Sequence, residues 1–298
     1  MAIQIRNRPG LIGAEILGVD MSQPIDDATF AVIRQAILDR CVVVFPGQAK
    51  MTPADQIVFS RRFGDLVPSE LANVNPPGYP DIFIVSNAVR DGKPIGAREV
   101  GRHWHTDFQH LKAAAALTML HAHKIPPEKG DTEFSDMRAA YDALDDATKQ
   151  RIDTLEVLHS RVQAWPIMFP ERPPLTPEQA ARTPDVVHPL VRIHPETGRR
   201  SLYITANKAA WEIIGMPREE GQKLLADLLA HSLQEQFRYV HVWRDHDYLI
   251  WENRCLLHRA TPFESDKYER IMYRTTVAGT PTFGPKDQAN SPTSAAAA

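Results

Sequence analysis

The sequence predicts a mainly β protein with flanking helices. Short apolar and β-branched runs recur along its 298 residues, helical patterns are few, and the 24 prolines disfavour a helical bundle. Many short strands with few helices favour a closed or double-sheet β architecture over a doubly wound one. The sequence shows no internal repeat or linker, so we expect residues 1–285 to form a single domain and the low-complexity tail at 286–298 to be disordered.

The first half of the chain alternates predicted strands with two predicted helices. The helix at 26–40 starts with acidic residues and has apolar residues at helical spacing. The next helix, which ends near Gly64, has Thr52 as its N-cap and Pro53 as its first residue. The apolar, β-branched run at 41–45 predicts a buried strand. Further strands are expected at 11–19, 81–86, 113–121 and 132–135.

The second half combines two more helices with further strands. A helix is expected at 138–154 and an amphipathic one at 218–232. The Pro-rich, aperiodic segment at 160–189 predicts an inserted lid-like or binding loop, with a disordered surface loop as the alternative. Strands are expected at 187–194, 201–205, 237–243, 248–251 and 271–277.

Composition and charge exclude several classes of protein. The formal net charge of -3 gives no basis for a nucleic-acid or polybasic membrane surface, and no apolar run reaches the ~18 residues of a spanning helix. The first ten residues lack the apolar core of a signal peptide, and Cys41 and Cys255 are too few for a disulfide framework. We therefore expect a cytoplasmic, reduced protein that binds neither nucleic acid nor membrane.

His105 and Asp107 form the most informative pattern. In an extended segment the two side chains of H-x-D lie on one face. His258 follows far downstream, and it can meet the pair only if the sheet folds back on itself, as in a jelly roll. Two imidazoles and one carboxylate are typical of non-haem Fe(II) oxygenases, and the absence of nearby cysteines in the sequence disfavours structural zinc. The alternative is a surface histidine beside a turn-forming aspartate.

Two arginines follow His258. Arg270 is expected at the start of the next strand, and Arg274 lies four residues further on, so both can share a face. Guanidinium groups inside a barrel are costly unless each meets an anion, and arginine binds carboxylates in a bidentate manner. The pair therefore indicates anionic ligands, with exterior salt bridges as the alternative.

Several segments occur in the order found in one enzyme family: GAEILGVD, VVVFPGQ, FSRRFGDL, WHTD, GDTEFSDMRAAYDAL, HPLVRIHPETGRRSLYI, WENRCLLHRA and RIMYRTT. The chain thereby resembles the taurine / 2,4-dichlorophenoxyacetate dioxygenase (TauD/TfdA) family of Fe(II)- and 2-oxoglutarate-dependent dioxygenases, and most closely its aryloxyalkanoate-cleaving branch. The resemblance implies a double-stranded β-helix (jelly roll, cupin-like) core with flanking helices. It also implies Fe(II), 2-oxoglutarate and O₂ as cofactor and cosubstrates. Family members are often homo-oligomers, which leaves a dimer or a tetramer open.

The resemblance implies roles for individual residues. Thr132 and Arg270 match the residues that hold the distal carboxylate of 2-oxoglutarate, and Trp251 matches an aromatic residue near the iron. The positions that match the iron ligands are His105, Asp107 and His258.

Other positions point to the substrate. Arg274 matches an arginine that faces the anionic group of the substrate or supports the cosubstrate. Arg102 and His103 replace polar residues that contact substrate in relatives, so they are expected to add positive charge near the pocket. Glu252 departs from the family's WDNR pattern, and we expect it to face away from the iron.

The implied reaction hydroxylates a C–H bond of a small anionic substrate, with formation of succinate and CO₂. An aryloxyalkanoate-like carboxylate, cleaved at its C–O bond, is favoured, and a sulfonate or sulfate such as taurine or an alkyl sulfate is the alternative. A metal-dependent hydrolase and a non-catalytic binding barrel are the rival classes. Apolar residues of the insert either cover a hydrophobic substrate or pack on the barrel: Trp165, Ile167, Met168 and Phe169.

Overall fold

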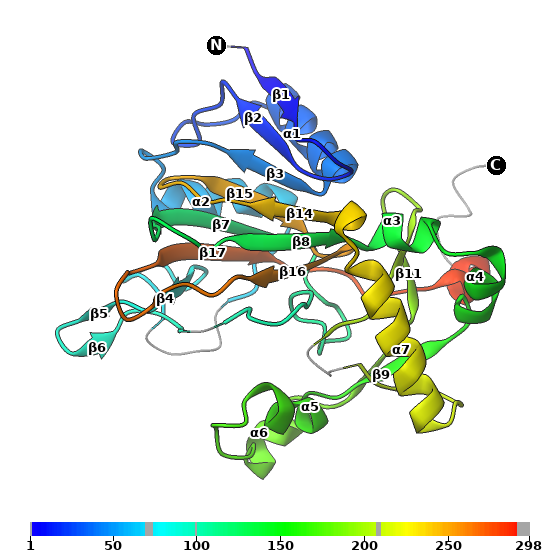
Figure 1. Ribbon diagram of the computed structural model, residues 1–298. Helices are drawn as coiled ribbons and strands as arrows, with labels where there is room; N and C mark the ends of the chain where they lie inside the picture. Colours follow the sequence, from blue (N-terminus) through cyan, green and yellow to red (C-terminus); the bar gives the residue numbers. More distant parts are fainter. Residues whose placement is uncertain (1, 69–73, 99, 207–209, 291–298) are drawn as a thin grey trace.

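The computed structural model describes residues 2–68, 74–98, 100–206 and 210–290 (Figure 1). It is mainly β with flanking helices, which confirms the predicted class at that level. In spatial order, the larger sheet contains β1 (Gln4–Asn7), β2 (Ala14–Leu17), β3 (Val42–Phe45), β15 (Tyr248–Glu252), β7 (Leu117–Lys124), β17 (Ile271–Val277) and β4 (Phe83–Ser86). A three-stranded sheet contains β14 (Arg238–His241), β8 (Thr132–Asp136) and β16 (Leu256–Ala260).

Shorter strands and the helices complete the fold. Smaller sheets are formed by β10 (Val186–Pro189), β9 (Glu156–His159) and β13 (Ala210–Ile213), by β11 (Val191–Ile193) and β12 (Arg200–Leu202), and by β5 (Val89–Arg90) and β6 (Lys93–Pro94). The α-helices are α1 (Asp27–Arg40), α2 (Pro53–Ser60), α3 (Met137–Asp142), α4 (Asp146–Ile152), α5 (Arg161–Met168), α6 (Pro177–Ala181) and α7 (Arg218–Ser232). The 3₁₀ helices are η1 (Arg61–Phe63), η2 (Glu235–Phe237) and η3 (Pro285–Asn290).

The strand β3 is buried on both faces, as its uninterrupted apolar sequence predicts. Val43 and Phe45 pack in the core beneath α1 and α2, whereas Val42 packs with Phe134 of the smaller sheet. Successive side chains of a strand point to opposite faces. The smaller sheet therefore covers one face of the larger sheet, and α1 and α2 cover the other (Figure 1).

Capping residues set the starts of two predicted helices at the positions expected. The Asp26 side chain accepts the Thr29 amide at 2.8 Å, and α1 begins directly after it. Thr52 and Asp55 form a reciprocal capping box at the start of α2. The helix expected at 218–232 has the bounds of α7.

The single helix expected at 138–154 is wrong. Asp145 accepts the Thr148 amide at 2.8 Å and begins a second helix, so the segment forms α3 and α4. The strands β1, β9 and β13 were not predicted, because each is only four residues long and shows no apolar alternation. The segment at 160–189 contains α5, α6 and β10, and Thr176 forms a capping box with Gln179 that its sequence already signals. Of the tail, residues 286–290 belong to η3, and 291–298 lie outside the described residues.

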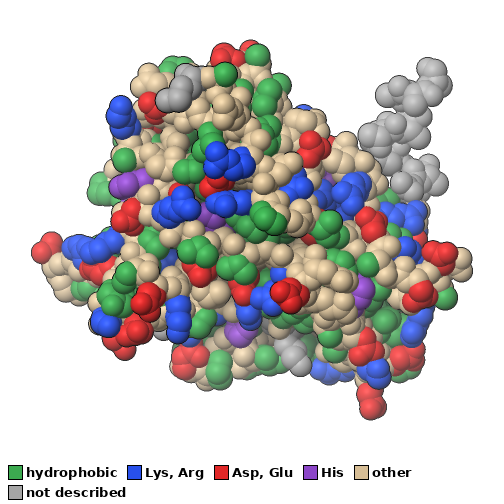
Figure 2. Space-filling view, turned by 45° about the horizontal axis from the view of Figure 1, so that its top comes forward, with side chains coloured by type: hydrophobic (Ala, Val, Ile, Leu, Met, Phe, Trp, Pro, Cys, Tyr) green, Lys and Arg blue, Asp and Glu red, His purple; other side chains and the backbone are tan. Residues whose placement is uncertain are grey.

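Opposite charges are interspersed over the face shown in Figure 2. Exposed ion pairs such as Arg90–Glu269 and Lys124–Glu269 contribute little to stability, so the apolar cores dominate it. Cys41 and Cys255 are free, buried thiols whose Sγ atoms are 3.4 Å apart. Within the described residues, no helix is both long and apolar enough to span a membrane.

Buried histidines predict a loss of stability in mild acid. Burial lowers the pKa of His121 to about 3 and that of His123 and His188 to about 4, from an ordinary value of 6.5. Unfolding then takes up protons below pH 6.5, so the free energy of unfolding falls as the pH decreases from 6.5 towards 4. We expect the Tm of the apoprotein, followed by circular dichroism, to be lower at pH 5 than at pH 7.

A matched pair of variants tests this explanation. Burial also lowers the pKa of His159, which is 1% exposed, whereas His103 is exposed. His159→Phe should flatten the dependence of Tm on pH, and His103→Asn should leave it unchanged. An equal Tm at pH 5 and pH 7 in the wild type would contradict the prediction.

Candidate active site

The two histidines of the predicted metal site are joined through their backbones. His105 lies in the loop after β6, and His258 lies within β16. The amide of each residue donates to the carbonyl of the other, at 3.0 and 2.9 Å, and forms an isolated antiparallel bridge. Their imidazole centroids are 4.2 Å apart, although the residues are distant in the sequence.

Asp107 completes this group. The Nε2 atom of His105 is 3.7 Å from Asp107 Oδ1, and the Nε2 atom of His258 is 3.8 Å from Asp107 Oδ2. One ligand atom from each residue lies within 4.8 Å of the others. The H-x-D spacing thus brings both side chains to one point, although His105 lies in a bridge rather than in a full strand.

The protonation states suit a divalent metal. Burial alone would raise the pKa of Asp107, but His258, Arg274, His105 and the Thr118 hydroxyl hold it at about 2. Burial lowers the pKa of His258 to about 3. At neutral pH the site therefore offers a carboxylate and, at His258, a neutral imidazole, which are the forms that bind metal.

His105 and Asp107 line a cavity of about 300 Å³. Arg274 lines it, with Nη1 3.7 Å from Asp107 Oδ1 and the guanidinium carbon 4.5 Å from the centroid of the Phe83 ring. The Nε atom of Arg274 is buried and has no hydrogen-bond partner among the described residues. This cation is placed to receive an anionic group beside the metal site.

The helix α5 and Phe169, the residue that follows it, contribute an aromatic wall to the same cavity. Trp165, Met168 and Phe169 line the cavity, and the ring centroids of Trp165 and Phe169 are 4.7 Å apart. The guanidinium carbon of Arg172 lies 4.3 Å from the Phe169 centroid. Ile167 is 47% exposed and does not belong to this wall.

Arg161 is a residue of the cavity that sequence reasoning missed. It is the first residue of α5, and its Nη1 lies 3.4 Å from Nε2 of His110, which also lines the cavity. Burial and then the charge of Arg161 lower the pKa of His110 to about 4. The sequence offers no signal for this pair, because neither residue belongs to a motif.

Arg270 lines a different, smaller cavity of about 90 Å³, together with Thr261 and Arg102. It is 7% exposed, and among the described residues its Nε has no hydrogen-bond partner. Burial lowers its pKa to about 10, against the opposing effect of Asp131. Arg270 therefore remains a cation at neutral pH, in a confined space that an anion would fill.

Thr132 lies beside this second cavity. It pairs with Ala260, which lines the cavity, in the register of β8 and β16. The indole N–H of Trp243 donates to Thr132 Oγ1 at 2.9 Å. An indole nitrogen can only donate, so the threonine hydroxyl accepts here and retains its own proton for donation.

Arg102 and His103 are both exposed and line a third cavity of about 210 Å³ with His105 and Phe169. The carbonyl of His103 lies 2.7 Å from Nδ1 of His105. Because a carbonyl only accepts, His105 carries its proton on Nδ1 and leaves Nε2 available to a metal. His103 thus contacts the candidate metal ligand His105 through its backbone carbonyl. Arg102 lines both the cavity of Arg270 and the third cavity.

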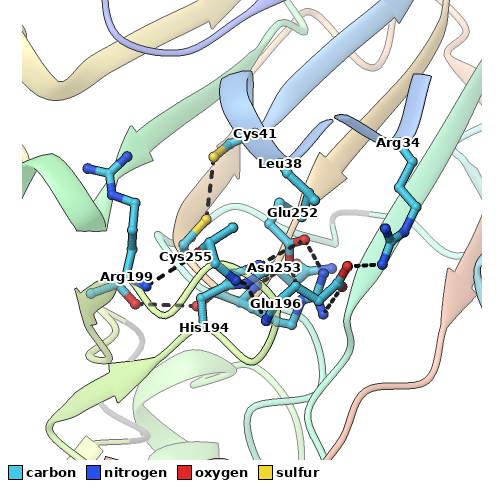
Figure 3. A network of polar contacts seen from close by, with 12 residues as sticks. Arg34, Leu38, Cys41, His194, Glu196, Arg199, Glu252, Asn253 and Cys255 are labelled. Carbon is cyan, nitrogen blue, oxygen red and sulfur yellow. Dashed lines mark hydrogen bonds and ion pairs between the residues drawn. The ribbon is translucent and has the colours of Figure 1, made fainter. Parts of the chain in front are cut away.

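The end of β15 directs successive side chains to opposite sides. Trp251 is 3% exposed, and its ring centroid is 4.8 Å from that of His258. Glu252 points to the opposite side, into a network of polar contacts (Figure 3). There Arg254 binds the Glu252 carboxylate through Nε at 2.7 Å and Nη2 at 2.5 Å, and it also binds Glu196. Glu252 thus faces away from the candidate metal site, as the sequence predicts.

Two further residues touch the site and were not predicted. Thr118 Oγ1 donates to Asp107 Oδ2 at 2.6 Å, and Asn253 Oδ1 accepts the amide of Asp107 at 3.3 Å. Both are buried. A polar threonine within an apolar strand and the asparagine of the WENR segment are the only signals for them in the sequence.

A mainly β fold with two imidazoles and one carboxylate beside a cavity is typical of the non-haem metal oxygenases. Comparison with known proteins identifies the family within this class. The model of the taurine catabolism dioxygenase TauD, TfdA family matches residues 4–276. The chain belongs to this family and is a 2-oxoglutarate-dependent dioxygenase. Members of the family use Fe(II), 2-oxoglutarate and O₂.

Relatives align with this chain over most of its length. An (S)-phenoxypropionate/alpha-ketoglutarate-dioxygenase of Sphingobium herbicidovorans is 35% identical over 286 residues, which is 94% of this chain and 96% of the relative. An alpha-ketoglutarate-dependent 2,4-dichlorophenoxyacetate dioxygenase of Cupriavidus pinatubonensis is 33% identical and covers 90% of this chain and 95% of its own. The crystal structure of AAD-2 in complex with Mn(II) and N-oxalylglycine has a TM-score of 0.81 and 34% identity, covering 95% of this chain and 99% of that chain.

The network around Glu252 predicts a structural role. Glu252→Gln removes the negative charge that neutralises the buried guanidinium of Arg254, so the free energy of unfolding should fall by about 3 kcal/mol. Urea denaturation measures this loss. As a matched control, Arg34→Gln breaks an exposed ion pair at the edge of the same network and should change stability by less than about 1 kcal/mol. Unchanged stability of Glu252→Gln, or loss of its metal binding, would contradict the structural role.

Proposed function

We propose that His105, Asp107 and His258 are the ligands of the Fe(II) that this family uses. The convergence of two imidazole nitrogens and one carboxylate within 4.8 Å of one another supports this assignment most directly. Bound Fe(II), with 2-oxoglutarate and O₂, supplies the oxidant that hydroxylates a substrate C–H bond while 2-oxoglutarate becomes succinate and CO₂. The carbonyl of His103 holds His105 in the tautomer that leaves Nε2 for the metal.

We further propose that Arg270 and Thr132 bind the distal carboxylate of 2-oxoglutarate. The buried guanidinium of Arg270 offers a charge and an unsatisfied Nε, and the Thr132 hydroxyl retains a proton to donate. Such a pair holds a carboxylate in one orientation. Trp251, packed against His258, excludes water from that side of the site and restrains the imidazole ring.

The substrate is proposed to bind in the cavity of Arg274. The guanidinium would hold the anionic group, and the wall of Trp165, Met168 and Phe169 would cover an aromatic or apolar body. An aryloxyalkanoate-like carboxylate fits both features. Hydroxylation of the carbon next to the ether oxygen would give a hemiacetal or hemiketal, and cleavage of its bond to the ether oxygen would release a phenol and leave an oxo acid. Arg102 and His103 are proposed to line the outer part of the pocket.

This proposal also concerns the architecture around the site. We assign the larger sheet and the three-stranded sheet to a double-stranded β-helix within a single domain, and the segment at 160–189, with α5 and α6, to a lid over the pocket. The resemblance of the chain to its family supports the first assignment, and the contacts of α5 with the cavity support the second. The cytoplasmic location, the absence of nucleic-acid and membrane partners, and a dimeric or tetrameric state stay predictions.

The reaction is tested by adding O₂ to the protein loaded with Fe(II) and 2-oxoglutarate, with a panel of aryloxyalkanoates, sulfonates and alkyl sulfates. We expect an aryloxyalkanoate to stimulate succinate formation most strongly, because the pocket joins a cation to an aromatic wall. His105→Ala and Asp107→Ala should abolish turnover with little change in circular dichroism. Wild-type succinate formation by these variants would exclude the ligand assignment, and stimulation by a sulfate or sulfonate alone would favour the other substrate class.

Substitution of each arginine should affect the binding of a different anion, 2-oxoglutarate for Arg270 and the substrate for Arg274. Arg270→Ala should raise the KM for 2-oxoglutarate by about 10- to 100-fold, the equivalent of about 1.5–3 kcal/mol for a charged hydrogen bond, and should affect the substrate KM much less. Arg274→Ala should show the opposite pattern, and each variant is the matched control of the other. Steady-state succinate assays measure both constants. Identical patterns for the two variants would contradict the division of roles.

A further inference from the structure

The carboxylate of Asp107 is held by a continuous chain of buried hydrogen bonds. Trp251 Nε1 donates to Asn253 Oδ1 at 3.0 Å, and Asn253 Nδ2 donates to Thr118 Oγ1 at 2.8 Å. Thr118 then donates to Asp107 Oδ2 at 2.6 Å. All four residues are 5% exposed or less, so water cannot readily replace these contacts.

The direction of every bond in this chain is determined by its donors. The indole of Trp251 and the amide of Asp107 can only donate, and both point to the same atom of Asn253, which must therefore be its carbonyl oxygen. The other terminal atom of Asn253 is then the NH₂ group, and it must donate to Thr118. The Thr118 hydroxyl accepts that bond, so its own proton is available for Asp107 Oδ2.

The middle of the chain is fixed to the fold at several points. Thr118 and Trp251 are direct partners in the register of β7 and β15. The amide of Asn253 donates to Ala116 O at 2.8 Å, and its carbonyl accepts the Thr106 hydroxyl at 2.7 Å. The backbone of Asn253 thus binds both the residue that precedes β7 and the loop that contains His105 and Asp107. The side chains of the neighbouring Glu252 and Arg254 bind each other.

We propose that Thr118, Asn253 and Trp251 are positioning residues that fix the orientation of the Asp107 carboxylate, an inference that rests on Asp107 being a metal ligand. Thr118 engages Oδ2 and leaves Oδ1 as the oxygen without a hydrogen bond from this chain. His105 Nε2 and Arg274 Nη1 both lie 3.7 Å from Oδ1, whereas His258 Nε2 lies 3.8 Å from Oδ2. The orientation of the carboxylate is thus set before the metal arrives.

The consequence is a higher metal affinity than the three ligands alone would give. Without the Thr118 hydroxyl, the carboxylate can rotate, and the two oxygens become equivalent competitors for the metal. Loss of a hydrogen bond to a metal ligand typically costs about 10- to 100-fold in metal affinity. Trp251 and Asn253 act through Thr118, so their loss should reduce the affinity less than the loss of Thr118 itself.

The test is anaerobic titration of the apoprotein with Co(II), followed by its visible absorption, in the absence of 2-oxoglutarate. Thr118→Val keeps the side-chain shape and removes the hydroxyl, and we expect it to weaken Co(II) binding by about 10- to 100-fold. Thr118→Ser restores the hydroxyl and should bind Co(II) nearly as tightly as the wild type. The absorption of the Thr118→Val complex should also change, because the coordination by Asp107 changes.

Thr275→Val is the matched control. Thr275 is a buried threonine on the adjacent strand β17, and its hydroxyl contacts Ser60 at 2.8 Å rather than the metal site. It should lose stability without losing Co(II) affinity. Equal Co(II) affinity and spectra for Thr118→Val and the wild type would overturn the proposal, as would an equal loss of affinity in Thr275→Val. Failure of the wild type itself to bind Co(II) would instead exclude the metal site proposed above.

Discussion

The arrangement of the site depends on one pair of backbone hydrogen bonds, between His105 and His258. These bonds join a loop to the strand β16, and they bring together two imidazoles that the sequence separates widely. Backbone bonds position side chains without using the side chains themselves, so both rings remain available as ligands. Asp107 follows His105 by two residues, and its place is then largely determined by the course of the loop.

The two arginines lie in different surroundings. Arg274 lies beside Asp107 and Phe83, whereas Arg270 lines a separate cavity. A strand argument alone places both arginines on one face, and it does not distinguish the two cavities. The separation arises because Arg270 precedes β17, where its backbone amide binds Asn87, while Arg274 lies within the strand.

The sequence predicts best what local chemistry determines. Asp26 and Thr52 are capping residues whose bonds lie within a few positions, so α1 and α2 begin where expected. The candidate metal ligands could be found because their residue types are rare in combination. The role of Asn253 could not be predicted, because most of its partners come from two distant segments, around Thr106 and around Thr118, that only the fold brings together. The break after Asp142 was missed because an apolar pattern continues across it, although Asp145 is itself a capping residue.

The aromatic wall of the cavity comes from one short segment, α5 and the Phe169 that follows it, whereas the candidate ligands come from a loop and from the strand β16. Mutations in α5 therefore alter the shape presented to an incoming molecule without disturbing the bridge of His105 and His258. Over evolutionary time, a descendant of this chain could exchange one surface helix and acquire a new preference while inheriting its reaction intact. Because substrate preference and the reaction depend on different parts of the chain, related enzymes can differ in substrate while they keep the same metal ligands.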